Sequence, residues 1–154
     1  MAKKPDNQED LKQLVAAART PGLPERWVQL AGRLDTNSFS RYLAMQVFTC
    51  NWDGYAMFKN NYRVYHDPES GRLYFIPHGM DQTFGRTLSP LLPRRWEGLV
   101  ARAFMETSEG RALYQRQIGL LFTNVYQTAE QVRRVDELAG TLRPLFAEQG
   151  ARAA

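Results

Sequence analysis

The first third of the chain alternates apolar and polar positions at the spacing of amphipathic helices. Residues 9–19 (EDLKQLVAAAR) predict a short helix, and the following TPGLP segment predicts a turn, because proline and glycine interrupt helices. Residues 25–34 (ERWVQLAGRL) predict a second short helix, or a helical turn broken near Gly32. Residues 35–48 (DTNSFSRYLAMQVF) predict a better helix, which Asp35 or Thr36 can cap.

The pattern then changes to the two-residue alternation of a strand. Residues 61–66 (NYRVYH) and 72–77 (RLYFIP) predict the two strands of a hairpin. The DPESG segment between them predicts its turn, with Gly71 as the residue that tolerates positive φ. The flanking segments, residues 49–60 and 78–93, predict loops.

Helical spacing returns in the last third, with predicted helices near Arg94–Met105, Glu109–Tyr126 and Ala129–Ala147. In the last of these, Pro144 is expected to end or kink the helix. The pattern as a whole predicts an α+β fold that is predominantly helical, with one hairpin. We expect residues 1–9 to be a polar leader, residues 10–147 to form one domain and residues 148–154 to be a disordered tail.

Composition narrows the function classes. The net charge of +4 on 154 residues is small, and no basic run is interleaved with aromatics, which disfavours nucleic-acid binding. The single cysteine, Cys50, rules out a disulfide framework and is interpreted as a small buried apolar residue and not as a nucleophile. The two histidines, His66 and His78, have no third nitrogen ligand nearby for zinc. No segment has the length of a membrane span.

Polar side chains gather at the open end of the predicted hairpin. Asp53, Asn60 and Asn61 precede its first strand, and Asp81 follows its second, so all four are expected at the same end. Oxygen donors without sulfur suit a hard cation such as Mg²⁺ or Mn²⁺. Structural interpretations stay open: Asp53-Gly54 as a tight hairpin turn, the two asparagines as turn formers, and Asp81 as a cap.

The same stretch resembles the CotH kinase family, the atypical protein kinases first associated with spore coats. The resemblance rests on the segments NWDGY, NNYRVY, D-x-x-S-G and IPHGMDQTFG, and it extends from about Asp10 to Phe146. It implies an atypical kinase-like C-terminal lobe whose hairpin carries the acidic site. The complete domain would transfer a phosphoryl group from Mg²⁺- or Mn²⁺-bound ATP to a protein substrate.

The resemblance also implies roles for individual residues. Asp53 matches the catalytic aspartate that orients the acceptor hydroxyl, Asn61 or Asn60 matches the metal-binding asparagine, and Asp81 matches the metal-binding aspartate. Two departures stand out. Phe58 occupies the position where ordinary kinases place their metal-binding asparagine, and Gly79 replaces a second acidic residue that family members often carry.

A kinase also needs a lysine that grips the phosphates from an N-terminal lobe. No lysine here lies in a strand context, so we interpret the chain as a C-terminal lobe without that partner. Lys59 is the candidate substitute, but its place in a loop disfavours that role. We therefore expect weak or no activity from this chain. The alternative is a non-catalytic interaction or structural module derived from the kinase fold.

A lobe of this kind is expected to expose an apolar face and to self-associate through it. The aromatic candidates for that face are Trp27, Trp52, Tyr55, Phe58 and Trp96, for which core packing is the other interpretation. Family members are often exported or attached to the cell surface, but residues 1–11 contain no apolar segment of the kind that a signal peptide has, so the location stays open.

Overall fold

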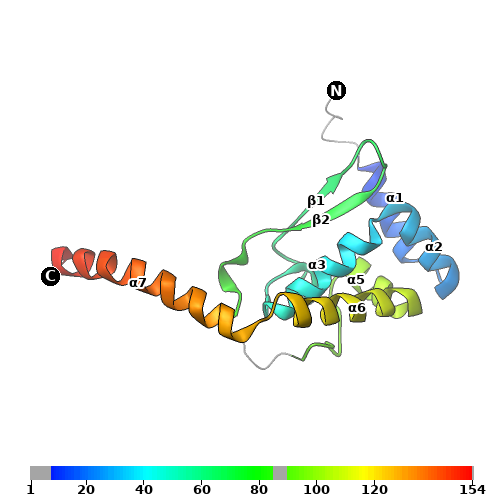
Figure 1. Cartoon of the computed structure of the whole chain (residues 1–154). Coiled ribbons are helices and arrows are strands. Elements are labelled where there is room, and N and C mark those ends of the chain that lie inside the picture. Colours follow the sequence, from blue (N-terminus) through cyan, green and yellow to red (C-terminus); the bar gives the residue numbers. More distant parts are fainter. Residues whose placement is uncertain (1–7, 85–89, 154) are drawn as a thin grey trace. The chain divides into compact units, whose positions relative to one another are not determined.

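The computed structural model describes residues 8–84 and 90–153, which are predominantly helical and contain one two-stranded antiparallel sheet (Figure 1). The predicted fold class, α+β with mostly helix, is confirmed. The chain divides into two compact units, residues 1–118 and 119–154. Within the described ranges, no helix has both the length and the apolar composition needed to cross a bilayer.

Three helices open the first unit: α1 (Glu9–Ala18), α2 (Leu23–Arg33) and α3 (Thr36–Phe48). α2 starts two residues earlier than expected because Pro24 fits the first helical turn, and Gly32 does not break it. Asp35 caps α3: its carboxylate accepts the backbone N–H of Ser38 at 2.7 Å. The first and third predicted helices are thus confirmed within a residue or two.

The hairpin consists of β1 (Tyr62–His66) and β2 (Leu73–Pro77), paired so that Tyr62 lies opposite Pro77. The turn forms as expected. The Asp67 carboxylate accepts the Ser70 hydroxyl at 2.5 Å, and Gly71 has a φ of +68°.

β2 faces the core. Its Leu73 and Phe75 are buried, and α3 packs against it. Phe75 lies in an aromatic cluster with Phe39 and Tyr55, whose ring centroids are each 4.8 Å from its own. Phe39 in turn meets Phe104 edge to face at 5.3 Å. Burial of each such side chain contributes roughly 1.5–3 kcal/mol, so this cluster fixes the hairpin on the helices.

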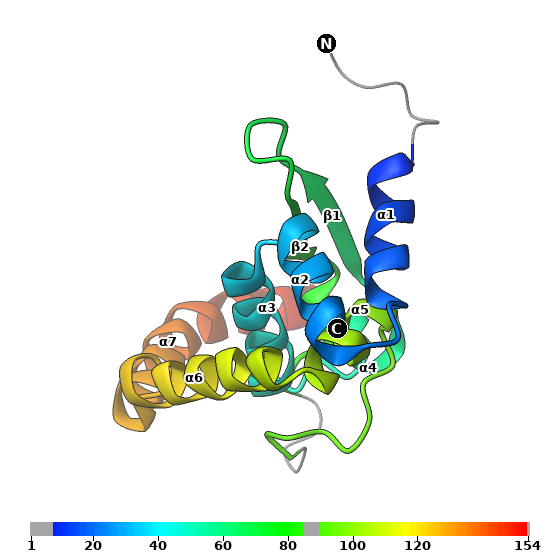
Figure 2. The ribbon, with the colours of Figure 1, turned by 90° about the vertical axis from the view of Figure 1, so that its right-hand side faces the viewer.

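Phe104 belongs to α5 (Leu99–Glu106), which packs with α1 and α2 (Figure 2). The prediction that this helix begins at Arg94 is wrong by five residues. The Glu97 N–H donates to the Ala56 carbonyl at 2.9 Å, which holds the preceding chain outside a helix. Gly98 then passes so close to Tyr55 that a Cβ there would lie 2.6 Å from its ring.

Two short helical elements occupy segments predicted as loops. α4 (Tyr55–Phe58) follows the Asp53 loop, and a 3-10 helix, η1 (Met80–Gln82), follows β2. Of the aromatics proposed for an exposed face, Tyr55 and Trp96 are buried, Trp27 and Trp52 are half-buried, and Phe58 is exposed.

The last two helices are α6 (Ser108–Asn124) and α7 (Thr128–Ala153). α7 contains Pro144 without ending there and continues through residues 148–153, where a disordered tail was expected. A proline removes one backbone hydrogen bond and clashes with the preceding turn, but the N–H groups of the residues after it can still donate to carbonyls four residues earlier.

Candidate functional site

The site begins where the chain reverses direction after α3. Cys50 adopts a left-handed conformation with φ of +50°, and the backbone N–H of Asn51 then donates to the Gln46 carbonyl at 2.9 Å. The Asn51 side-chain amide also donates to Gln46 Oε1 at 2.9 Å, and both residues are 1% exposed. A buried amide pair therefore anchors the first residue of the loop that carries Asp53.

Gly54 packs directly over this amide pair. A Cβ at position 54 would overlap Gln46 Oε1 and lie 3.0 Å from Asn51 Nδ2. The next residue, Tyr55, is buried, and its hydroxyl accepts the Val100 N–H from α5 at 2.9 Å. Burial raises the pKa of Tyr55 to about 12. Asp53 is thus held between fixed residues on both sides.

Asp53 itself is half-buried and accepts hydrogen bonds from both asparagines. Asn61 Nδ2 donates to Asp53 Oδ2 at 2.6 Å, and Asn60 Nδ2 donates more weakly to Oδ1 at 3.3 Å. The structure therefore brings together three of the residues predicted at the open end of the hairpin. Asp53-Gly54 is not a hairpin turn, because α3 precedes it and α4 follows it.

Asn61 also reaches the segment that follows β2. Its carbonyl accepts the His78 N–H at 3.1 Å, and a Cβ at position 79 would lie 2.9 Å from Asn61 Oδ1. Gly79 has a φ of +58°, which favours glycine as well. Because the Asn61 amide nitrogen faces Asp53, its oxygen is left facing the segment that leads to Asp81.

Asp81 lies in η1 and is exposed. The segment that contains it is held at its far end, where the Phe84 N–H donates to the Thr49 carbonyl at 2.7 Å. Gly85, which follows in the sequence motif, lies outside the described residues. Among the residues described, the Asp81 side chain makes no hydrogen bond or ion pair.

The donor set is one of oxygens only. Within the described part of the chain, no group of three His, Cys, Asp or Glu side chains could hold a metal ion. Mg²⁺, however, commonly takes only one or two protein carboxylates and completes its shell with water and phosphate oxygens. The Asn61 oxygen and the Asp81 carboxylate are donors of the types that such a site uses.

Lys59 and Phe58 lie between Asp53 and the asparagines. The Lys59 ammonium is 3.8 Å from the Glu97 carboxylate, which also contacts Arg95 at 2.6 Å. Phe58 is 61% exposed and its ring centroid is 6.1 Å from that of Trp52. The position of the asparagine in ordinary kinases is therefore occupied by a side chain in an aromatic contact.

The backbone of this region has a feature that the sequence does not reveal. Four non-glycine residues in the described chain have positive φ: Cys50, Lys59, Asn61 and Phe84. All four flank the site. Asparagine tolerates this conformation, but lysine, cysteine and phenylalanine adopt it rarely. Strained conformations of this kind persist only where the surroundings fix them, and they cluster at functional sites.

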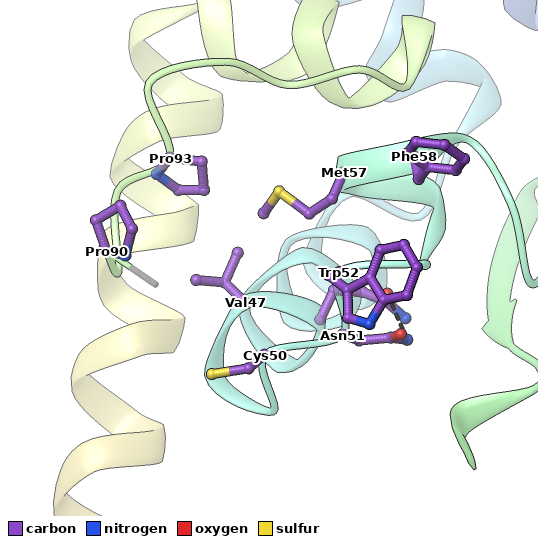
Figure 3. A pocket seen from close by; sticks show the side chains of 9 residues that line it. Val47, Cys50, Asn51, Trp52, Met57, Phe58, Pro90 and Pro93 are labelled. Atoms are coloured by element: carbon purple, nitrogen blue, oxygen red, sulfur yellow. Dashed lines mark hydrogen bonds between the residues drawn. The ribbon is translucent and has the colours of Figure 1, made fainter. Parts of the chain in front are cut away.

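An apolar pocket of about 330 Å³ adjoins the Asp53 loop (Figure 3). Val47, Trp52 and Met57 line it together with two prolines, Pro90 and Pro93. Cys50 also lines this pocket and is half-buried, so it is less buried than the sequence predicted.

Comparison with known proteins finds a family model that matches nearly the whole chain and relatives that match part of it. The family model described as CotH kinase protein matches residues 2–152. Invasin CotH2 and invasin CotH3 of Rhizopus delemar are 28% identical over 112 residues and 29% identical over 114 residues, covering 61% and 73% of this chain. Inner spore coat protein H of Bacillus subtilis is 32% identical over 89 residues, or 56% of the chain. The matches cover 19%, 18% and 24% of these relatives, so the chain corresponds to less than a quarter of each.

Proposed function

The chain belongs to the CotH kinase protein family, and we propose that it carries the acidic half of a phosphotransferase site. In the complete domain, this site would transfer a phosphoryl group from ATP, bound with Mg²⁺ or Mn²⁺, to a hydroxyl of a protein substrate. The observation that supports this most directly is the 2.6 Å hydrogen bond from Asn61 to Asp53, made beside the segment that carries Asp81.

Asp53 is the proposed catalytic residue. Phosphoryl transfer needs an acceptor hydroxyl in line with the phosphate and a group to take its proton. Asn61 holds one carboxylate oxygen of Asp53 firmly, while the other accepts only the longer 3.3 Å bond from Asn60. That second oxygen can exchange a weak partner for the acceptor hydroxyl, because the cost of losing so long a hydrogen bond is small.

Asn61 and Asp81 are the proposed metal ligands, and Asn60 and Lys59 the residues nearest the nucleotide. A bound divalent cation would neutralise charge on the phosphate oxygens. The Asn61 amide would present its oxygen to the cation and its nitrogen to Asp53, coupling the two halves of the site. Lys59 is 62% exposed in its pair with Glu97, and an exposed ion pair contributes only about 0–1 kcal/mol, so the ammonium can turn to a phosphate.

The second candidate is a non-catalytic interaction or structural module. The pairing of Lys59 with Glu97 favours it, since a phosphate-gripping lysine would have to leave that carboxylate. One relative of the chain is named a spore coat protein, which is compatible with a structural role. The two candidates differ in whether the acidic residues bind nucleotide.

Calorimetric titration of ATP with Mg²⁺ or Mn²⁺ separates them. We expect binding that requires the cation and is lost in Asp81→Asn, because a neutral amide removes the cation's one charged ligand from η1. Asp53→Asn should keep most of the nucleotide affinity, since the proposed role of Asp53 is toward the acceptor. Glu69→Gln, at the exposed turn end of the hairpin, is the control for loss of a carboxylate elsewhere.

Two results would contradict the proposal. Equal nucleotide binding in Asp81→Asn and the unsubstituted chain would show that Asp81 holds no cation. Absence of binding in every variant, with the fold intact by circular dichroism, would show that this chain does not use ATP by itself and would favour the module.

A further inference from the structure

α7 carries an apolar stripe that is exposed along its length. Its six large apolar side chains are between 45% and 65% exposed. They are Val132, Val135, Leu138, Leu142, Leu145 and Phe146. Singly exposed apolar residues are ordinary, but a continuous stripe on one helix marks a surface that packs against another.

The spacing of the stripe is that of a coiled-coil seam. Val132, Val135, Ala139, Leu142 and Phe146 are separated by alternating steps of three and four residues, which is the a/d heptad pattern. Leu138 and Leu145 widen one edge of this seam.

The helix also needs such packing. Gly140 and Pro144 lie inside α7 on the face away from the seam, and they lower its intrinsic stability by about 1 and about 3 kcal/mol relative to alanine. The intrinsic helix propensity of its residues therefore does not account for a helix of 26 residues. Packing of its apolar face against a partner does account for it.

The charges along α7 fall into two classes. Those on the outer face pair within the helix: Arg133 with Glu130 and Glu137, and Arg134 with Glu137. Asp136 and Arg143 instead lie along the other edge of the seam, seven positions apart, and neither forms an ion pair with any residue that the structure describes. Asp136 and Arg143 are thus two opposite charges beside an apolar surface, and neither has an ion-pair partner among the described residues of its own chain.

We propose that α7 pairs with α7 of a second copy of this chain as an antiparallel coiled coil. In an antiparallel pair each edge of the seam meets the same edge of the partner. With Ala139 facing Leu142 of the partner subunit, and Val135 facing Phe146 of the partner subunit, Asp136 meets Arg143 of the partner subunit. Two-fold symmetry makes this ion pair twice.

Other arrangements lose this complementarity. A shift by one heptad in either direction sets Asp136 against its own copy or Arg143 against its own copy, and like charges repel. A parallel pair sets Asp136 beside Gln131, and Arg143 beside Leu138, so neither finds an opposite charge. The antiparallel register centred between the two charges is therefore the one that the sequence of α7 selects, and it is independent of any phosphotransferase activity.

The test is sedimentation velocity of the full chain over a wide range of concentration. We expect a monomer–dimer equilibrium whose dissociation constant rises about tenfold in Asp136→Arg, because two exposed attractions become repulsions. The same should hold for Arg143→Asp, and the double variant Asp136→Arg with Arg143→Asp should restore the original constant. Glu148→Arg and Arg134→Asp make the matching charge changes on the outer face of α7. These two control variants should leave the dissociation constant unchanged.

Orientation is tested by disulfide trapping in a Cys50→Ser background. Ala139→Cys and Leu142→Cys chains, mixed under oxidised glutathione, should form the mixed disulfide between one chain of each kind. Disulfides between identical chains would indicate a parallel pair and overturn the register. A monomer at every concentration, or single charge reversals that dimerise as well as the original chain, would overturn the proposal; in the monomer case the stripe would be left to a different partner.

Discussion

Gly54→Ala tests whether the Asp53 loop is held by the amide pair beneath it. The backbone at position 54 has a φ of −81°, which alanine adopts without strain. The added methyl group, however, would overlap Gln46 Oε1 and lie 2.9 Å from Gln46 Cδ and 3.0 Å from Asn51 Nδ2. Both amides are 1% exposed, so neither can move into solvent without opening the core.

The expected loss of stability follows from two costs. Forcing a methyl group into a filled interior costs about 1–3 kcal/mol. Separating the Gln46–Asn51 hydrogen bond leaves a buried amide unsatisfied, at about 1–3 kcal/mol. The two costs are alternatives in part, because a shift that relieves the clash breaks the bond. We therefore expect the free energy of unfolding to fall by about 2–4 kcal/mol.

Gly32→Ala is the matched control. Gly32 lies within α2, and a Cβ there would meet nothing within 4 Å. Alanine is favoured over glycine in a helix by about 1 kcal/mol, so this variant should be more stable than the original chain. The same chemical change is thus expected to have opposite signs at the two positions.

Urea unfolding followed by tryptophan fluorescence is the assay. All three tryptophans, Trp27, Trp52 and Trp96, lie in the unit of residues 1–118, so the signal reports on the unit that contains the site. Adding Gln46→Ala to Gly54→Ala should cost less than the sum of the two single changes, because the smaller side chain makes room for the methyl group. An unchanged midpoint in Gly54→Ala, or strict additivity in the double variant, would show that the Gln46–Asn51 amide pair does not hold the loop.

Two further changes probe the same region. Gly79→Ala should lower the free energy of unfolding by about 1–2 kcal/mol, because alanine is strained in the left-handed region. It should also weaken cation-dependent ATP binding by displacing Asn61, and unaltered binding in titration would contradict this. Tyr55→Phe should cost about 1 kcal/mol by removing the acceptor of the Val100 N–H, whereas Tyr62→Phe, in the same aromatic cluster, should cost less. Since burial raises the pKa of Tyr55 from 10.0 to about 12, the folded state holds that proton more tightly, and stability should fall as pH rises through this range. Tyr55→Phe should reduce this loss of stability between pH 9 and pH 11, measured by urea unfolding at each pH. An equal loss in the variant and the original chain would argue against it.

The parts of the structure that depend on near neighbours in the chain could be predicted from the sequence. The Asp35 cap bonds three residues ahead, and the Asp67–Gly71 turn closes on itself. The gathering of Asp53, Asn60 and Asn61 follows from the alternation that defines the hairpin, which sets its open end. Local rules suffice in each case, since the partners are within eight residues of one another.

The features that position the site could not be predicted, because they depend on contacts between separate elements. α5 begins at Leu99 because Gly98 meets the ring of Tyr55, 43 positions away, and no periodicity encodes that contact. The left-handed Phe84 likewise lies where its backbone N–H donates to Thr49, 35 positions earlier in the chain. Phenylalanine rarely adopts a left-handed backbone, so its presence in the sequence does not indicate one.

At Gly79, the sequence resemblance and the tertiary contacts bear on the same residue. The sequence shows only that an acidic residue frequent in the resembling family is missing there. In the structure, the backbone at position 79 is left-handed, and a Cβ there would lie 2.9 Å from the Asn61 side-chain oxygen. An aspartate at this position would therefore need either a strained backbone or a displaced Asn61, and displacing Asn61 would also remove the hydrogen bond that orients Asp53. Glycine at position 79 therefore leaves the chain one carboxylate fewer and leaves Asn61 in place. We expect Gly79→Asp to weaken the proposed metal site instead of adding a ligand to it. A gain in cation affinity in the same titration would show that Asn61 is not the ligand that Gly79 accommodates.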